Sequence, residues 1–220
     1  MGKNNFLAAM DFSKNPKADL TKSIKKEIPF FDHTDYFIDE KSNTFKWGNT
    51  YQIFNSKGKE IGTVSQNVST SEKIWRVLIN KAIVPFSLEV RSTDGQLQAT
   101  ISKGWSFMRP EVAITDSKNQ RVGSIEKKLS LGRSNFKILD SGGSQIAGIK
   151  GSLASWDFEI KDMKGSQLGK ISKKWAGLAK EIFTTQDKYN VHIDSKLTQQ
   201  DNRISILVSA IAIDMILKNG

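Results

Sequence analysis

The stretch that decides the fold is DNRISILVSAIAIDMILKNG, residues 201–220. Between Ile204 and Leu217 its only polar side chains are Ser205, Ser209 and Asp214. A helix with apolar side chains all round is typical of a protein core or of a membrane. As a helix, these residues would be about 21 Å long. This is shorter than the helix of roughly 20 residues that is needed to cross the core of a bilayer. The short length and Asp214 therefore favour a helix buried inside the protein over a membrane anchor, because an unpaired carboxylate in hydrocarbon is costly.

Upstream of this stretch, five segments share one pattern of residues, which indicates a repeated structural unit. They are YQIFNSKGKEIGTV (51–64), LEVRSTDGQLQATI (88–101), VAITDSKNQRVGSI (112–125), FKILDSGGSQIAGI (136–149) and FEIKDMKGSQLGKI (158–171). Each begins with alternating apolar residues, as a half-buried strand does. Asn, Ser or Asp then starts a turn, and three residues later comes a Gly or Asn that accepts φ > 0. Each unit is therefore predicted to be a β-hairpin.

Each hairpin also has a small residue near its end, which indicates a bulge or a close approach of the backbone. These residues are Gly62, Ala99, Gly123, Ala147 and Gly169. With segments 35–40, 72–80 and 188–193 as further strands, the chain has about a dozen strands. Closing such a sheet into a barrel removes its exposed edges, but about twelve strands leave a lumen that their own side chains do not fill.

The apolar segment, as a helix over about 202–217, is predicted to fill this lumen. The expected fold is mainly β, a single closed barrel of about twelve antiparallel strands around a central hydrophobic C-terminal α-helix. Asp201 and Asn202 are expected to cap the start of the helix. The residues expected to define the central helix are Ile204, Leu207, Val208, Ile211, Asp214 and Leu217.

Asp214 is expected to lie at the barrel mouth or to pair with a basic residue, because buried charges need partners. Residues 1–33 are expected to form a polar, flexible lead-in, and residues 34–220 the barrel.

The formal net charge of +10 favours a polyanionic partner, either nucleic acid or an anionic membrane, although it also serves solubility alone. No nucleic-acid-binding motif is present, so nucleic acid is not expected as a partner and anionic lipid ranks above it. The chain has no cysteine, which excludes disulfides and thiol chemistry. No apolar run near residue 1 is long enough for a signal peptide, so a cytoplasmic location is expected.

Residues with catalytic potential do not form a recognisable set. The two histidines, His33 and His192, have no metal-ligand spacing, and no nucleophile–base pair can be assembled. We therefore expect no enzyme activity, no metal and no cofactor.

The best surface candidate is SKKWAGLAKEIF (172–183). As a helix it would carry an apolar face with lysines away from it. This pattern is typical of a membrane-surface helix and also of a helix that covers a barrel end, and the second is favoured because one short helix binds lipid weakly. The lipid-binding candidates are Lys173, Lys174, Trp175 and Lys180.

The run GKISKKWAGLAKEIFTTQDKYNV (169–191), followed by a helix that contains AID (212–214), resembles the phospholipid scramblases. The matching positions are Lys170, Ile171, Trp175, Gly177, Leu178, Glu181, Phe183, Thr184, Asp187 and Tyr189. PFSLEVRSTDGQLQATI (85–101) is also similar to a stretch of that family. The resemblance spans about residues 47–217 and implies a tubby-like fold of the LURP-one-related superfamily, a twelve-stranded barrel around a central helix. The family's palmitoylated cysteine cluster and Pro-rich extension are absent from this sequence, so it looks like a minimal, barrel-only member.

Animal scramblases also have an acidic segment that is proposed to bind calcium and begins Asp-x-Asp. Its first, third and twelfth positions correspond here to Thr185, Asp187 and Lys196. One carboxylate among lysines is a poor calcium site, and the alternation in 189–193 predicts a strand instead of a loop. Calcium activation is therefore not expected.

The resemblance implies a phospholipid scramblase-like protein, peripheral at the membrane, that binds phospholipids or moves them between leaflets without ATP. The alternative is a soluble tubby-like module that binds anionic lipid headgroups or a protein partner and does not scramble lipids. A third hypothesis is a structural or stress-related scaffold. A helix sealed in the barrel cannot breach a bilayer, so scrambling would require its release or oligomers on the membrane surface.

Overall fold

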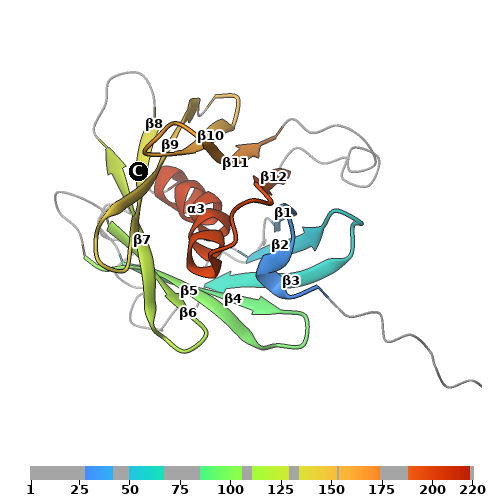
Figure 1. Cartoon of the computed structure of the whole chain (residues 1–220). Helices are drawn as coiled ribbons and strands as arrows, with labels where there is room; N and C mark the ends of the chain where they lie inside the picture. The colour runs from blue at the N-terminus through green and yellow to red at the C-terminus, as the bar shows by residue number, and fades with distance from the viewer. Residues whose placement is uncertain are drawn as a thin grey trace, which may run out of the picture.

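The computed structural model describes residues 28–41, 50–66, 85–105, 111–128, 134–152, 154–173 and 188–218. Within these ranges, twelve antiparallel strands form a closed barrel around the helix α3, Gln200–Lys218 (Figure 1). The strands are β1 Asp35–Lys41, β2 Thr50–Asn55, β3 Glu60–Gln66, β4 Phe86–Ser92, β5 Leu97–Lys103, β6 Glu111–Asp116, β7 Arg121–Lys128, β8 Ser134–Asp140, β9 Gln145–Ser152, β10 Asp157–Asp162, β11 Gln167–Ser172 and β12 Lys188–Ile193. A short 3-10 helix, η1 Phe30–Asp32, precedes β1.

The barrel has the simplest antiparallel order, since each strand pairs with its neighbour in the sequence. Pairing of β12 with β1, from Asp35 opposite His192 to Asp39 opposite Lys188, closes it. The order gives the barrel two different ends. The turn end holds the five hairpin turns, 55–60, 92–97, 116–121, 140–145 and 162–167. The loop end holds the opposite ends of the strands, which include Glu40, Lys103, Lys128, Ser152, Ser172 and Lys188.

The hairpin turns form as predicted. In the turn after β8, Asp140 Oδ1 accepts hydrogen bonds from the backbone N–H groups of Gly142 at 3.0 Å and Ser144 at 2.8 Å. Asn55, Asp116 and Asp162 accept the same pair of bonds in their turns. The left-handed position is occupied by Gly143 with φ 85° and its equivalents, including Asn119 with φ 60°. Local sequence therefore determines these turns.

The small residue of each hairpin lies at a bulge, which confirms that prediction. In β6–β7, for example, the register shifts next to the pair Ile114–Gly123, and the same shift occurs in the other four hairpins. A Cβ on Gly123 would clash with the carbonyl oxygen of Leu139 in the neighbouring strand β8. Bulges bend and twist a strand, and five of them in the same place in each hairpin curve the sheet toward closure.

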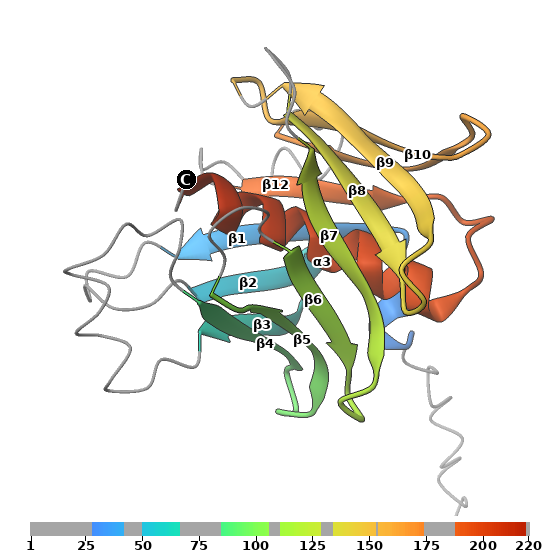
Figure 2. The ribbon, with the colours of Figure 1, turned by 90° about the vertical axis from the view of Figure 1, so that its left-hand side faces the viewer.

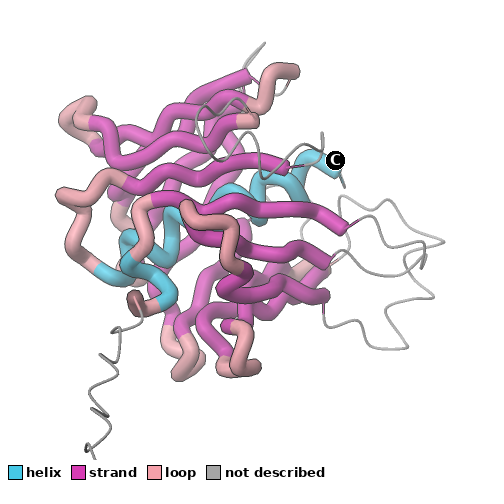
Figure 3. Tube along the Cα trace, turned by 90° about the vertical axis from the view of Figure 1, so that its right-hand side faces the viewer, coloured by secondary structure: helices cyan, strands magenta, loops and turns pink. Residues whose placement is uncertain are grey.

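Helix α3 runs through the lumen from the turn end to the loop end, as Figures 2 and 3 show from opposite sides. The described helices include none that is both long and apolar enough to cross a membrane. The buried position of the helix and the barrel around it confirm the predicted architecture. The predicted central residues Ile204, Leu207, Val208, Ile211 and Asp214 are all buried, and Leu217 lies in the last turn of the helix.

The ends of the helix differ slightly from the expected 202–217. Because it begins at Gln200, Asp201 and Asn202 lie inside its first turn and do not occupy the capping position that was predicted for them. A negative charge in the first turn still interacts favourably with the helix dipole. The strands expected over 35–40 and 188–193 are confirmed as β1 and β12, whereas the strand expected over 72–80 lies outside the described residues.

Core packing begins before the expected boundary at residue 34, since Phe31 of η1 is buried in the core.

Candidate functional site

The loop end of the barrel holds a buried polar group on an otherwise apolar helix. Asp214 is only 3% exposed, and Tyr51 of β2 donates a hydrogen bond of 2.8 Å from its Oη to Asp214 Oδ2. Tyr189 of β12 is buried beside them. Burial raises its pKa well above the ordinary value, and the negative charge of Asp214 raises it further. The cluster holds the C-terminal half of α3 against two strands.

Trp156, between β9 and β10, covers this part of the interior. Its ring stacks on the ring of Tyr189 with centroids 5.2 Å apart, and it meets Phe158 edge to face at 5.8 Å. Lys173 follows β11 and places its Nζ 5.5 Å from the centre of the Trp156 ring. The backbone N–H of Lys173 also donates to the carbonyl of Trp156 at 3.1 Å. Trp156 therefore lies between the half-exposed Lys173 and the buried Tyr189, close to the C-terminal half of α3.

Of the four predicted lipid-binding residues, Lys173 is the one that the structure describes, and it lies half-buried at the loop end. Lys174, Trp175 and Lys180 lie outside the described residues, as do Thr185 and Asp187. Trp156 was missed by sequence reasoning. The available signal was a tryptophan in the short connection between two repeat units, where a turn residue is more usual.

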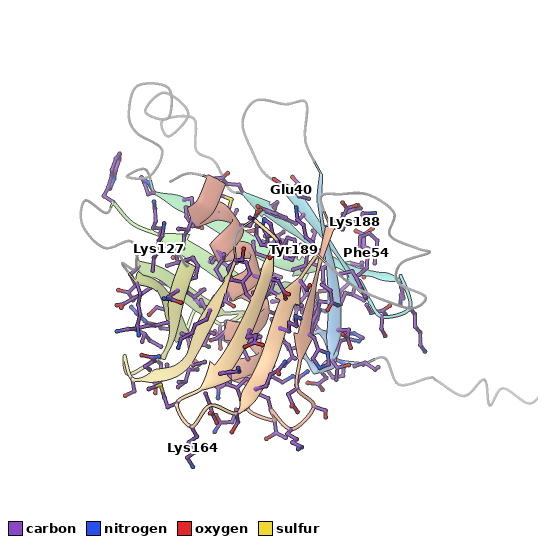
Figure 4. The ribbon with its side chains drawn as sticks, turned by 90° about the horizontal axis from the view of Figure 1, so that it is seen from above. Glu40, Phe54, Lys127, Lys164, Lys188 and Tyr189 are labelled. Atoms are coloured by element: carbon purple, nitrogen blue, oxygen red, sulfur yellow. The ribbon has the colours of Figure 1, made fainter. Side chains whose placement is uncertain are left out.

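Further aromatic and basic residues lie at the loop end. Trp105, just after β5, is 53% exposed. Lys127 and Lys128 at the end of β7 are exposed. Lys103 is buried, with Nζ 5.7 Å from the centre of the Phe86 ring, and burial lowers its pKa. In Figure 4, Lys127 and Lys188 lie far from Lys164, which marks the turn end.

The turn end is closed by a different polar cluster, centred on Arg203 in the first turns of α3. Arg203 is 6% exposed and donates three short hydrogen bonds to backbone carbonyls, to Phe31 at 2.6 Å, His33 at 2.7 Å and Leu197 at 2.8 Å. Tyr36 Oη donates to the carbonyl of Phe30 at 3.0 Å. Arg203 thus ties η1 and the segment before α3 to the helix.

Within the described ranges, no group of three or more His, Cys, Asp or Glu could hold a metal ion. His192 lies 3.0 Å from Asp35 at the barrel exterior. The segment that aligns with the family's proposed calcium site runs into β12, in which Tyr189, Val191 and Ile193 face the core, as the sequence predicted.

These features define the class of protein, a closed β-barrel with a buried C-terminal helix. The family model described as Scramblase matches residues 40–217, so the chain belongs to the scramblase family. A phospholipid scramblase family protein of Schizosaccharomyces pombe is 23% identical over 161 residues, which cover 69% of this chain and 42% of the relative. Human phospholipid scramblase family member 5 is 22% identical over 149 residues, 67% of this chain and 46% of the relative.

The altered inheritance rate of mitochondria protein 25 of Saccharomyces cerevisiae is 23% identical over 209 residues, 77% of this chain and 64% of that protein. The chain thus spans between 42% and 64% of the lengths of these relatives. Among solved structures, a protein from Arabidopsis thaliana matches with a TM-score of 0.48 and 10% identity, over 82% of this chain and 90% of that one.

Proposed function

We propose that the protein is a phospholipid scramblase-like protein that binds membrane phospholipids, or moves them between leaflets, without ATP and without calcium activation. The observation that carries the proposal is the family match over residues 40–217, which includes strands β2 to β12 and nearly all of α3. The two relatives of this family bear the words phospholipid scramblase in their names. The net charge of +10 supports an anionic membrane as the partner. The protein would act from the cytoplasm as a peripheral membrane protein.

Within the chain, we assign lipid binding to the segment after β11, with Lys173, Lys174, Trp175 and Lys180 as the binding residues. Lys173 supports the assignment because it is partly exposed and has a tryptophan ring beside it. A lysine contributes charge to a lipid phosphate, and a tryptophan suits the headgroup region.

The alternative is a soluble tubby-like module that binds anionic headgroups, or a protein partner, and does not scramble lipids. The observation that favours it is that α3 is buried and held at both ends, by Arg203 at the turn end and by Tyr51 at the loop end. A helix held in this way does not leave the barrel without breaking both contacts.

Two measurements on the full chain separate these functions. Flotation with anionic liposomes at low salt tests lipid binding, and a protein that stays in the soluble fraction contradicts both hypotheses. Transfer of fluorescent lipid between leaflets of reconstituted liposomes, with and without calcium, tests scrambling. Tyr51→Phe removes the hydrogen bond to Asp214 and should speed scrambling if release of the helix is required. If both the parent protein and Tyr51→Phe bind liposomes but neither scrambles lipid, the soluble binding module is the function that remains.

A further inference from the structure

The two ends of the barrel expose different chemistry. At the turn end, each of the five hairpin turns holds one carboxylate, at Glu60, Asp94, Asp116, Asp140 and Asp162. A hydrogen bond from Ser92 lowers the pKa of Asp94, and one from the backbone N–H of Ser166 lowers that of Asp162. Basic residues in the same turns, namely Lys57, Lys59, Lys118, Arg121 and Lys164, balance the carboxylates, so the five turns together carry no net charge to attract an anionic surface.

The loop end exposes tryptophan as well as lysine. Trp105 and Trp156 lie on different sides of the barrel, after β5 and between β9 and β10. Lys127 and Lys128 stand between them in strand order, at the end of β7, and Lys173 follows β11. Aromatic rings and lysines are thus distributed around the rim of this end.

Three of the acidic residues near this rim have a basic partner within the protein. Glu111 pairs with Arg121, Asp157 lies 3.0 Å from Lys170, and Asp39 lies 3.4 Å from Lys188. Lys127 and Lys128 are exposed, and neither makes an ion pair with a described residue. The exposed charges of Lys127 and Lys128, at the end of β7, would attract an anionic surface.

Trp156 has a backbone conformation that calls for an explanation. Its φ is 47°, in the left-handed region that bulky residues rarely adopt. Such strain persists only where surrounding contacts determine it, and it concentrates at functional positions. Here the contacts with Tyr189, Phe158 and Lys173 hold the ring across the rim, half-exposed. The ring therefore lies at the boundary between the barrel core and the outer surface of the loop end.

We propose that the loop end docks on the surface of an anionic phospholipid bilayer, with Trp105 and Trp156 at the headgroup level and Lys127, Lys128 and Lys173 on lipid phosphates. The barrel then stands on the membrane with the C-terminal end of α3 toward it and the hairpin turns away from it. This orientation rests on the proposed lipid binding and adds the face that the protein uses. Tryptophan prefers the interface between water and hydrocarbon, and lysine is attracted to anionic lipid.

The orientation can be read directly, because the chain has no native cysteine. Ser152→Cys at the loop end and Ser141→Cys at the turn end are matched exposed positions for a polarity-sensitive fluorophore. With vesicles of phosphatidylserine and phosphatidylcholine, the label at 152 should shift to the blue and the label at 141 should not. If the unlabelled protein does not bind these vesicles at all, the proposed function fails. Binding with a shift at 141, or with no shift at 152, overturns the orientation alone.

Charge variants give a second, independent test. Replacing Lys127 and Lys128 together by Ala should weaken vesicle binding about 25-fold, since each lysine near an anionic surface contributes roughly fivefold. Lys118→Ala with Lys164→Ala is the control, because it removes the same charge from exposed positions at the turn end. The control should bind within about twofold of the parent protein. Equal losses in both double variants would mean that only net charge matters, and would refute the docking face.

Discussion

Replacing Arg203 by Met should destabilise the protein by roughly 3–5 kcal/mol. Methionine is nearly as long but donates no hydrogen bond, so the carbonyls of Phe31, His33 and Leu197 lose the donor that now reaches them at 2.6–2.8 Å. Each of these bonds has a charged donor and contributes about 1.5–3 kcal/mol, toward the lower end for the part-buried carbonyls of His33 and Leu197. Burial of the methionine offsets part of this loss, by about 1.5–3 kcal/mol.

The measurement is urea unfolding, followed by circular dichroism and by tryptophan fluorescence. With a slope of about 2 kcal/mol per molar urea, the midpoint should fall by about 1.5–2.5 M. Arg91→Met is the control. Its side chain is 41% exposed and pairs with Glu89 at the surface, so it should lose less than about 1 kcal/mol. A loss as small as this for Arg203→Met would show that the guanidinium does not anchor the helix. If that variant does not fold, Arg203→Lys, which keeps a donor, should fold with intermediate stability.

Three further changes have defined outcomes. Gly123→Ala should destabilise by about 1–3 kcal/mol in urea unfolding, because its Cβ would meet the carbonyl oxygen of Leu139; a neutral effect would show that β8 moves easily. Asp140→Ala removes the acceptor of two backbone N–H groups in its turn and should cost roughly 1 kcal/mol in the same assay, whereas Asp140→Asn should retain most of the stability. Burial raises the pKa of Tyr189 well above the ordinary value, so the folded state keeps it neutral while the unfolded state ionises above about pH 10. Stability should therefore be constant below that pH and fall as pH rises above it, and Tyr189→Phe should fall less steeply in unfolding measured from pH 8 to 11.

The hairpins were predictable because their determinants are local. Each turn needs a side-chain acceptor at its start and a residue that accepts φ > 0 three positions later, and both lie within one short segment. Asp140 and Gly143 are an example, and the structure has both in the expected roles. The lumen was predictable from the number of strands. The helix that fills it was predictable from an apolar segment that is too short to cross a bilayer.

The polar contacts at the two ends of the helix could not be predicted in the same way. Arg203 is far in the sequence from Phe31 and His33, and its hydrogen bonds go to backbone carbonyls, which carry no signature in the sequence. Trp156 likewise depends on where β12 brings Tyr189. Such contacts depend on the closed barrel, which brings distant segments together, so they become visible only after the fold is known.

The packing of α3 bears on how lipid could be moved. Eight large apolar side chains of the helix are buried in the lumen, namely Ile204, Ile206, Leu207, Val208, Ile211, Ile213, Met215 and Ile216. Each contributes about 1.5–3 kcal/mol by burial, so release of the helix into water would cost as much as the whole stability of a typical domain. Release into lipid would recover the apolar contacts but would bring Asp214 into hydrocarbon. With the helix in place, the barrel can act on lipid only through its outer surface, and among the described residues it is at the loop end that half-exposed Trp156 lies beside Lys173.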